Sequence, residues 1–389
     1  MPATVVTRHG GFSGIDLNNS RFETLLSWVA ASVVTATAVI YALKPADDRG
    51  EQGAAFANRA PAQEPVELQK ARATEPDRGR DATAPEHIPW RGWKDVLLRS
   101  YQEIQDDRLL ALAAGVVFYS LVALFPAIAA GVSSYALVAD ANTMAKHLNL
   151  LANVVPGGTL DLLGTEITRI ARNSEGKLTF GFVIGLLIAL WSANAGMKAI
   201  FDALNIIYDE QEKRSFIWLN LTSLFFTFCA IAAALLAVSA VVVFPLILAA
   251  FGLSSFDKPI IGLLRWPVLL GLILLGLAVL YRYGPSRREA KWRWITVGSA
   301  FAAIAWLVAS LLFSWYLANF ANYNATYGSL GAVVGLMMWM WFSTIIVLVG
   351  AELNSEIERQ TARDSTVGQE KPLGFRGAVA ADTVGPAQA

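Results

Sequence analysis

The stretch LANFANYNATYGSLGAVVGLMMWMWFSTIIVLVGAELNSE, residues 317–356, decides the fold class of this chain. Its later part, residues 330–351, contains 22 residues without a charged side chain. A helix that rises about 1.5 Å per residue needs about 20 such residues to cross the hydrocarbon core of a bilayer. The stretch therefore predicts a membrane-spanning helix, which follows a polar turn and ends at the acidic residues that begin with Glu352.

The composition of the whole chain agrees with this prediction. Apolar residues make up 55% of it and charged residues 16%, a balance that is unusual for a soluble globular domain. Lys plus Arg and Asp plus Glu number 31 each, so bulk charge does not favour a nucleic-acid partner. The single cysteine, Cys229, lies inside an apolar block, which excludes a disulfide framework within the chain and a cysteine metal site.

Further apolar runs lie before the opening stretch, and together they predict an all-α, polytopic transmembrane helical bundle. The six predicted core spans cover about residues 109–139, 178–197, 216–245, 260–281, 294–319 and 330–351. Residues 25–43 predict one N-terminal helix, which either spans the bilayer or anchors at its surface.

The predicted domains are a polar N-terminal segment (residues 1–24), the N-terminal helix (25–43), a disordered mixed-charge linker (44–92), the membrane domain (93–358) and a disordered cytoplasmic tail (359–389). Residues 93–104 place Trp93, Val96, Leu97 and Tyr101 on one helical face. This pattern predicts an amphipathic helix that either lies at the membrane surface or packs on the protein.

Prolines and glycines mark expected kinks and close helix contacts. Pro126 and Pro245 interrupt two predicted spans, so we expect both helices to kink. Gly181 with Gly185 and Gly331 with Gly335 have the small-xxx-small spacing that allows helices to approach closely. Such contacts fit packing within one bundle as well as a homo-oligomer.

Three motifs resemble those of a known family. The motif YGSLGA at residues 327–332, followed by GAELN at residues 350–354, resembles the last helix of the YihY/BrkB family of bacterial inner-membrane proteins. Residues 113–126 and 191–216 resemble its first and second helices, and the similarity covers roughly residues 93–358. The resemblance implies a fold and a bacterial inner-membrane location. Family members have been labelled ribonuclease BN or linked to serum resistance, so it implies no substrate.

Charge distribution predicts the orientation of the bundle. With six alternating spans, the loops on one side hold 22 Lys and Arg residues and those on the other side hold six. The positive-inside rule then places the termini of the membrane domain in the cytoplasm.

Polar residues at the ends of two spans are the candidates for a gate. Asn194, Lys198 and Asp202 follow at i, i+4 and i+8 on one helical face, and Glu352 and Glu356 share a face of the last span. Both ends are predicted to lie at the cytoplasmic level, so we expect Lys198 to approach a glutamate as a gate or ion-coupling pair. In the alternative interpretation, the lysine extends to the lipid headgroups and the glutamates are a solvated helix end.

A second polar cluster precedes the last span. Asn319, Asn322, Asn324 and Tyr327 are uncharged and lie at the predicted external mouth. They either line a vestibule or only turn the chain.

The sequence does not favour an enzyme. Its three histidines, His9, His87 and His147, lie in the N-terminal segment, the linker and an external loop, away from any predicted acidic cluster. Phosphate-binding loops, nucleophile elbows and zincin motifs are also missing from the sequence. We therefore expect no catalytic residues, no metal and no cofactor, and ribonuclease activity is disfavoured.

The predicted function is that of a transporter, exporter or permease of unknown substrate. The alternative is a non-transporting membrane protein that organises the envelope by binding lipid or a protein partner. Transport requires a water-accessible line of polar groups through the bundle, whereas the alternative predicts a dry core. Expected partners are membrane lipids and a possible second copy of the chain, but no nucleic acid.

Overall fold

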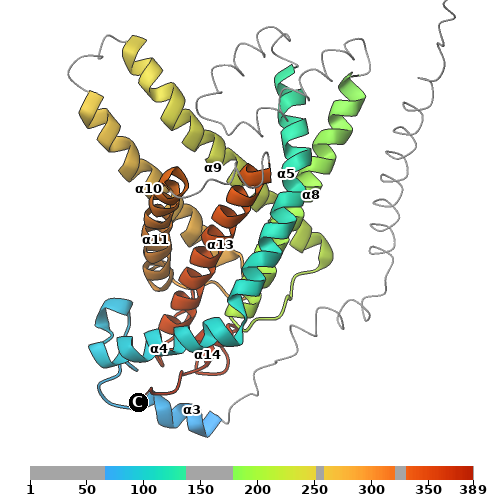
Figure 1. Ribbon diagram of the computed structural model, residues 1–389. Helices are drawn as coiled ribbons and strands as arrows, with labels where there is room; N and C mark the ends of the chain where they lie inside the picture. Colours follow the sequence, from blue (N-terminus) through green and yellow to red (C-terminus); the bar gives the residue numbers. More distant parts are fainter. Residues whose placement is uncertain (1–65, 137–177, 251–257, 320–329, 389) are drawn as a thin grey trace, which may run out of the picture. The chain divides into compact units, whose positions relative to one another are not determined.

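The computed structural model describes residues 66–136, 178–250, 258–319 and 330–388, all within the second of two compact units, Pro61–Ala389. Every regular element in these residues is a helix, as the sequence predicts, and a single backbone bridge joins Ala290 to Thr366 (Figure 1). The elements are α3 (Val66–Ala73), the 3-10 helix η1 (Pro85–His87), α4 (Trp90–Asp106), α5 (Leu109–Ala136), α8 (Leu178–Ile207), α9 (Phe216–Ala250), α10 (Lys258–Tyr283), α11 (Trp292–Asn319), α13 (Leu330–Glu358) and α14 (Val379–Asp382).

Several of the described helices are long and apolar enough to cross a membrane. By length and composition, three segments qualify, namely Phe216–Ala233, Trp292–Leu317 and Val333–Glu358. A fourth is added if Trp90–Asp106 and Leu109–Leu124, which meet at a 59° bend, form one broken span. These helices support a membrane fold, and the count of six core spans stays a prediction.

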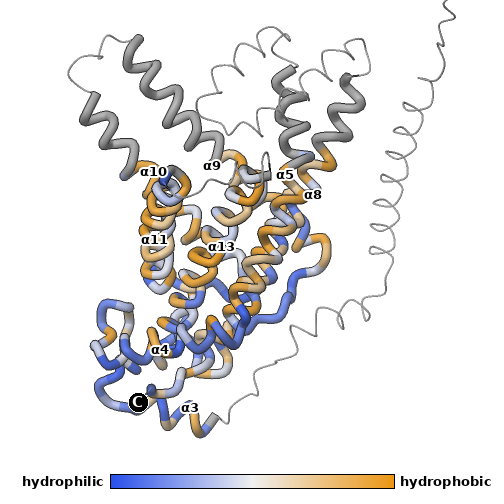
Figure 2. The backbone as a smooth tube through the Cα atoms, viewed as in Figure 1, coloured by the Kyte–Doolittle hydropathy of each residue, from blue (hydrophilic) through white to orange (hydrophobic). Residues whose placement is uncertain are grey.

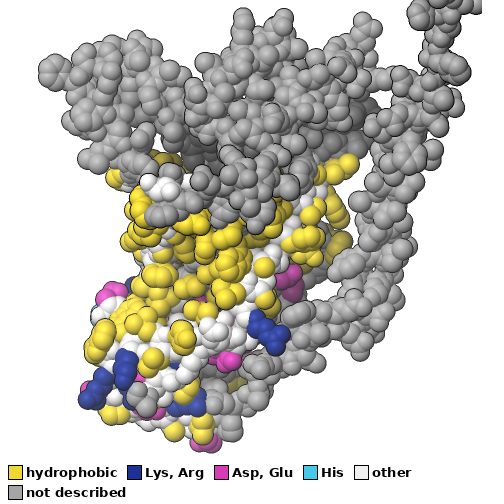
Figure 3. All heavy atoms as spheres, viewed as in Figure 1, with side chains coloured by type: hydrophobic (Ala, Val, Ile, Leu, Met, Phe, Trp, Pro, Cys, Tyr) yellow, Lys and Arg dark blue, Asp and Glu magenta, His cyan; other side chains and the backbone are white. Residues whose placement is uncertain are grey.

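The long helices expose apolar side chains along much of their length. Trp191 on α8 is 63% exposed and Trp218 on α9 is 64% exposed. Figures 2 and 3 show hydrophobic residues along these helices and charged residues gathered where α4 and the C-terminal residues lie. We call this charged region the polar end. An apolar outer surface beside a polar end is the arrangement that a lipid environment stabilises.

The buried core lies where the long helices meet near the polar end. α5 packs along α8, α11 packs along α13, and α13 also contacts α4, α5 and α8. Fully buried residues from different helices meet there, including Leu109, Leu204, Tyr281, Ile295 and Leu348. α13 is therefore the central element of the bundle, because it belongs to one of these pairs and contacts both helices of the other.

The closest helix crossing uses glycines that differ from the predicted pairs. A Cβ atom on Gly298 of α11 would clash with the carbonyl oxygen of Gly350 on α13, and one on Gly350 would come within 2.7 Å of Ala302 Cβ. At Gly335 a Cβ atom would meet no atom within 4 Å. The expected close approach at Gly335 therefore stays a prediction, and the tight contact between α11 and α13 lies about four turns further along α13.

Asn354 strengthens the same crossing from α13. Its Oδ1 accepts the backbone N–H of Gly298 at 2.8 Å, and its Nδ2 donates to the carbonyl of Ile295 at 3.2 Å. The side chain is fully buried, so these bonds satisfy both ends of an amide that would otherwise be costly to bury.

The proline predictions concern two of the long helices. α5 continues as one helix through Pro126, and the bounds of α9 include Pro245. The expected kinks at these residues stay predictions. Pro267 lies inside α10, where the sequence analysis expected no interruption.

Residues 359–388 differ from the disordered tail that the sequence suggested. Arg80 Nη2 donates to the carbonyl of Gly385 at 2.7 Å, and Arg376 Nη2 donates to the carbonyl of Ala362 at 2.6 Å. The tail is ordered by bonds from buried arginines to its backbone, and its composition alone does not reveal these partners.

The expected disordered linker is also corrected over the part that the structure describes, residues 66–92. Arg78 donates to the buried carboxylate of Asp95 at 2.6 and 2.7 Å. The same carboxylate accepts the backbone N–H of Gln388 at 2.9 Å. Linker, α4 and tail therefore support one another, while residues 44–65 lie outside the described part of the chain.

Helix α4 shows why both interpretations of its amphipathic pattern had support. Its buried face includes Val96 and Arg99, which face the protein. Trp90, Leu97 and Tyr101 form an exposed apolar edge, with exposed fractions of 76%, 51% and 66%. One face packs on the bundle, and the other leaves an apolar edge that suits a membrane interface.

Candidate functional site

The polar end contains a set of buried and partly buried ion pairs that we call the ionic clasp, formed by Arg99, Glu103, Asp209, Glu356 and Arg359. Arg99 and Glu356, which are 4% and 1% exposed, form an ion pair between α4 and α13. Arg359 forms ion pairs with Glu356 at 3.4 Å, with Glu103 at 3.9 Å and with Asp209. The clasp therefore joins α4, the residues after α8 and the end of α13.

Glu352 lies one helical turn from Glu356, toward the apolar part of α13. It is 1% exposed, and its Oε2 atom has no hydrogen-bond partner among the described residues. Its charged neighbours include Glu356, Asp107 and Arg359. A buried carboxyl group with an unpartnered oxygen is costly to retain, so this position is a candidate for a functional role.

Asp107 lies between α4 and α5, near the clasp. Burial raises the pKa of its carboxyl group to about 7, and the nearby carboxylates of Asp209 and Glu103 act in the same direction. The opposite influence comes from the guanidinium of Arg359. The charge of this carboxyl therefore changes within the neutral pH range.

A second buried pair lies beside the clasp. Arg287 donates to Glu358 through two bonds, of 2.6 and 3.1 Å, and both side chains are fully buried. The guanidinium carbon of Arg287 lies 4.0 Å from the centre of the Tyr208 ring. Ser365 Oγ donates to Glu358 at 2.9 Å. The pair thus joins the loop before α11, the end of α13 and the tail.

The predicted residues on α8 form a different cluster, the amide–lysine notch, made of Asn194, Lys198 and Asn220. Lys198 Nζ donates to Asn220 Oδ1 on α9, and Asn194 Nδ2 lies 3.5 Å from the same oxygen. The ammonium lies 5.5 Å from the centre of the Trp191 ring and 5.9 Å from that of Phe216. An amide oxygen and two aromatic faces therefore hold the positive charge.

Asp202 follows Lys198 by one turn of α8 and is exposed. In the nearby loop, Glu212 pairs with Arg214 at 2.8 Å. Burial alone would raise the pKa of Glu212, but hydrogen bonds from Arg214 and Asn205 lower it to about 2. Glu212 and Arg214 thus pair with each other, and Asp202 forms no ion pair among the described residues.

The predicted approach of Lys198 to Glu352 or Glu356 is not what the structure contains. Lys198 lies on the side of α8 that faces α9, whereas Glu356 bonds to Arg99 on α4. The two halves of the expected pair belong to separate clusters, because different faces of the bundle hold them. A gate at the polar end would use arginines in place of the lysine.

The predicted external cluster falls largely outside the described residues. Asn322, Asn324 and Tyr327 lie in that part of the chain. Asn319 is the last residue of α11, and its Nδ2 donates to the carbonyl of Trp315 at 2.7 Å. For Asn319 this bond at the end of α11 favours the alternative in which the residue only helps to turn the chain over one in which it lines a vestibule.

Sequence reasoning missed the cations and several acids of the clasp. One signal was present, because Arg99 lies one turn after Val96 on the face of α4 that packs on the protein. Asp209 gives no such signal, since its partner Arg359 is 150 residues away. Asn220 likewise depends on a neighbouring helix for its role.

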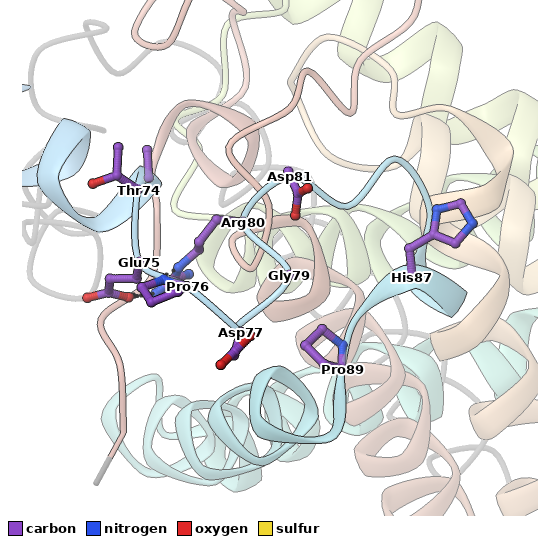
Figure 4. Close-up of a pocket in the computed structure, with 10 residues that line it drawn as sticks. Thr74, Glu75, Pro76, Asp77, Gly79, Arg80, Asp81, His87 and Pro89 are labelled. Carbon is purple, nitrogen blue, oxygen red and sulfur yellow. Dashed lines mark hydrogen bonds and ion pairs between the residues drawn. The ribbon is translucent and has the colours of Figure 1, made fainter.

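One surface pocket of about 510 Å³ lies along residues 73–89. Figure 4 shows Arg80 and Glu75 meeting at one side of it, and their ion pair measures 2.7 Å. Arg80 also donates to the tail, so this part of the lining is structural. Within the described residues, no group of three or more His, Cys, Asp or Glu side chains is arranged to hold a metal ion.

Comparisons with known proteins identify related sequences. A family model described as Virulence factor BrkB matches residues 100–373. The ribonuclease-like protein YfkH of Bacillus subtilis (strain 168) is 32% identical over 252 residues, which cover 64% of this chain and 90% of that protein. A UPF0761 membrane protein of Cronobacter sakazakii is 28% identical over 291 residues, covering 71% and 93%. No solved structure matches the chain.

Proposed function

Because the chain belongs to the Virulence factor BrkB family, whose motifs the sequence analysis recognised, we propose that this membrane protein is a transporter or permease closed at its polar end by the ionic clasp. The substrate is unknown, and the proposed role is not enzymatic. We place the protein in the bacterial inner membrane with the polar end in the cytoplasm, following the distribution of Lys and Arg.

The buried ion pair between Arg99 and Glu356 carries this proposal. Burying two charges costs several kcal/mol of desolvation, roughly, and packed apolar residues often stabilise a core as well or better. A purely structural contact therefore has little need of charged side chains at this position. A contact that opens and closes does, since separated charges are well solvated and paired charges are specific.

Glu352 extends the argument toward the membrane. Its buried side chain lies one turn of α13 from Glu356, on the side of the apolar part of the helix, and one of its carboxyl oxygens has no partner in the described structure. When the clasp opens, water reaches this carboxyl first. A pathway from the cytoplasm would then continue along α13, whose residues Ser343 and Thr344 carry hydroxyl groups about 12 to 14 Å further along the helix axis.

Water access to the middle of α13 tests the proposal. Ser343→Cys is introduced into a Cys229→Ala background, because Cys229 is exposed and is the only cysteine of the chain. The protein is reconstituted in vesicles and treated with a charged maleimide. We expect Glu356→Gln to increase labelling of the new thiol at least several-fold. Lys213→Gln serves as the control, because Lys213 is an exposed residue of the polar end and its ion pair, with Glu210, lies outside the clasp.

The two outcomes separate the functional alternatives. Faster labelling with Glu356→Gln alone supports a gated pathway. If the new thiol is not labelled in any variant of the folded protein but reacts after unfolding in detergent, the core is dry. That result would favour the alternative function, an envelope-organising membrane protein.

A further inference from the structure

The amide–lysine notch and Asp202 contain a positive and a negative group that form no ion pair among the described residues. Lys198 and Asp202 are four residues apart on α8, a spacing at which an ion pair can close. The ammonium instead bonds to Asn220, and Asp202 remains exposed. Neither side chain takes part in the salt bridges of the described residues.

Asn194 shows that the notch has unused hydrogen-bonding capacity. It is 4% exposed, and its Oδ1 atom has no partner among the described residues. Asn220 is fixed differently, because its Nδ2 donates to the carbonyl of Phe216 at 2.7 Å. This oxygen is an acceptor and cannot bond to an anionic oxygen. The Nδ2 group of Asn194, however, has two N–H donors, and only one of them bonds to a described residue, Asn220, so the second suits an anionic oxygen beside the ammonium.

The depth of the two charges follows from the helix ends. Asn220 lies about one turn after the start of α9 at Phe216, so the ammonium of Lys198 lies level with the first turn of that helix. The exposed Trp191 lies further toward the apolar part of α8. Asp202 lies about 6 Å beyond Lys198 in the opposite direction. From the apolar region outward, the order is an aromatic ring, a positive charge and a negative charge.

We propose that this notch binds the headgroup of a zwitterionic phospholipid that carries a primary ammonium group. In such a lipid the phosphate adjoins the glycerol and acyl chains, and the ammonium lies two carbons further out. Lys198 Nζ and the second N–H of Asn194 Nδ2 donate to the phosphate oxygens, while the carboxylate of Asp202 accepts hydrogen bonds from the ammonium. Trp191, which is 63% exposed, contacts the start of the acyl chains. The site does not depend on the proposed transport function.

A lipid titration of the purified full-length protein tests the site. Phosphatidylethanolamine, phosphatidylcholine and phosphatidylglycerol with identical acyl chains are added to the protein in detergent, with inorganic phosphate as a separate probe. The measurement is the rise in melting temperature with lipid concentration. We expect phosphatidylethanolamine to bind best, because trimethylated choline cannot donate a hydrogen bond and glycerol carries no positive charge.

Three variants assign the roles of the two charges. Lys198→Gln is expected to weaken phosphatidylethanolamine binding about tenfold, a change of about 1.4 kcal/mol in binding free energy. Asp202→Asn is expected to remove the preference for ethanolamine over choline while leaving phosphate binding intact. Lys213→Gln removes a nearby exposed charge and should bind like the unmodified protein. Asp202 is exposed, so its variant is informative even if Lys198→Gln does not fold.

Several results would overturn the proposal. Equal stabilisation by the three lipids would show solvation without headgroup recognition, and a preference for phosphatidylglycerol would assign a general anionic site. Equal losses in Lys198→Gln and Lys213→Gln would show a diffuse charge effect. A shift with inorganic phosphate as large as that with phosphatidylethanolamine would assign the notch to a free anion.

Discussion

The ionic clasp and the amide–lysine notch both carry charges near the ends of membrane helices, but the two regions differ in how far these charges are buried and whether they form ion pairs. In the clasp, Arg99 and Glu356 are buried and paired. In the notch, Lys198 is half-buried and Asp202 exposed, and each lacks an ion pair within the described residues. The difference suggests that charges paired within the protein hold its elements together, whereas charges left open at the lipid level are available to a ligand.

The largest expected effect comes from removing one partner of the clasp. Arg99→Gln leaves the carboxylate of Glu356 buried beside Arg359 alone, and breaking a buried pair typically costs about 3 to 5 kcal/mol. We expect a loss of this size in the free energy of unfolding, measured by denaturant titration in detergent. Lys198→Gln is the matched control from the notch and should cost less than about 1 kcal/mol. Similar losses in both variants would remove the distinction between the two regions.

A smaller effect is expected at the helix crossing next to the clasp. Gly298→Ala places a methyl group against the carbonyl of Gly350, and such overpacking costs about 1 to 3 kcal/mol. Gly335→Ala on the same helix pair enters open space and should stabilise the helix by about 0.5 to 1 kcal/mol. Thermal unfolding of both variants measures the contrast. If both changes were equally harmful, α11 and α13 would not cross as described.

The remaining expected effect appears only as the pH changes and concerns Asp107. Its pKa is raised by burial to about 7 in the folded protein, above the ordinary value of 3.8. The protonated carboxyl therefore favours folding, so this contribution is complete below about pH 4 and is lost as the pH rises through 7. We expect Asp107→Asn to raise the melting temperature at pH 8 relative to the unmodified protein and to change it little at pH 4.

The exposed neighbour Asp106 supplies the control for this pH measurement. Asp106→Asn should change the pH dependence of melting much less, because the carboxylate of Asp106 has a weaker influence on the pKa of Asp107 than burial, Asp209 and Glu103 have. If Asp107→Asn melted like the unmodified protein across the whole pH range, the carboxyl would not be buried against the acids of the clasp.

Sequence patterns were sufficient for the features that depend on neighbouring residues. The uncharged run at residues 330–351 lies inside α13, and the amphipathic pattern near Trp93 became α4. The motifs around Tyr327 and Gly350 identified the family that the comparisons confirm. Helix type and apolar burial in lipid are local properties, because each residue contributes through its spacing and hydropathy.

The partners of the charged residues could not be obtained in this way. The sequence placed Lys198, Glu352 and Glu356 at helix ends but paired the lysine with the wrong helix, since the direction each face takes depends on packing. The glycines of the tight helix crossing, Gly298 and Gly350, likewise differ from the pairs that the spacing indicated. Spacing along one helix does not specify which helix lies opposite.

The sequence by itself determined an all-α membrane protein, because long apolar segments can satisfy their backbone hydrogen bonds in lipid only as helices when no closed barrel is formed. Only the tertiary structure decided that Arg99 and Arg359 hold the acids of α13, that residues 359–388 are ordered, and that Lys198 faces Asn220. These contacts join residues up to several hundred positions apart. They depend on three-dimensional packing, which brings together groups that no local pattern relates.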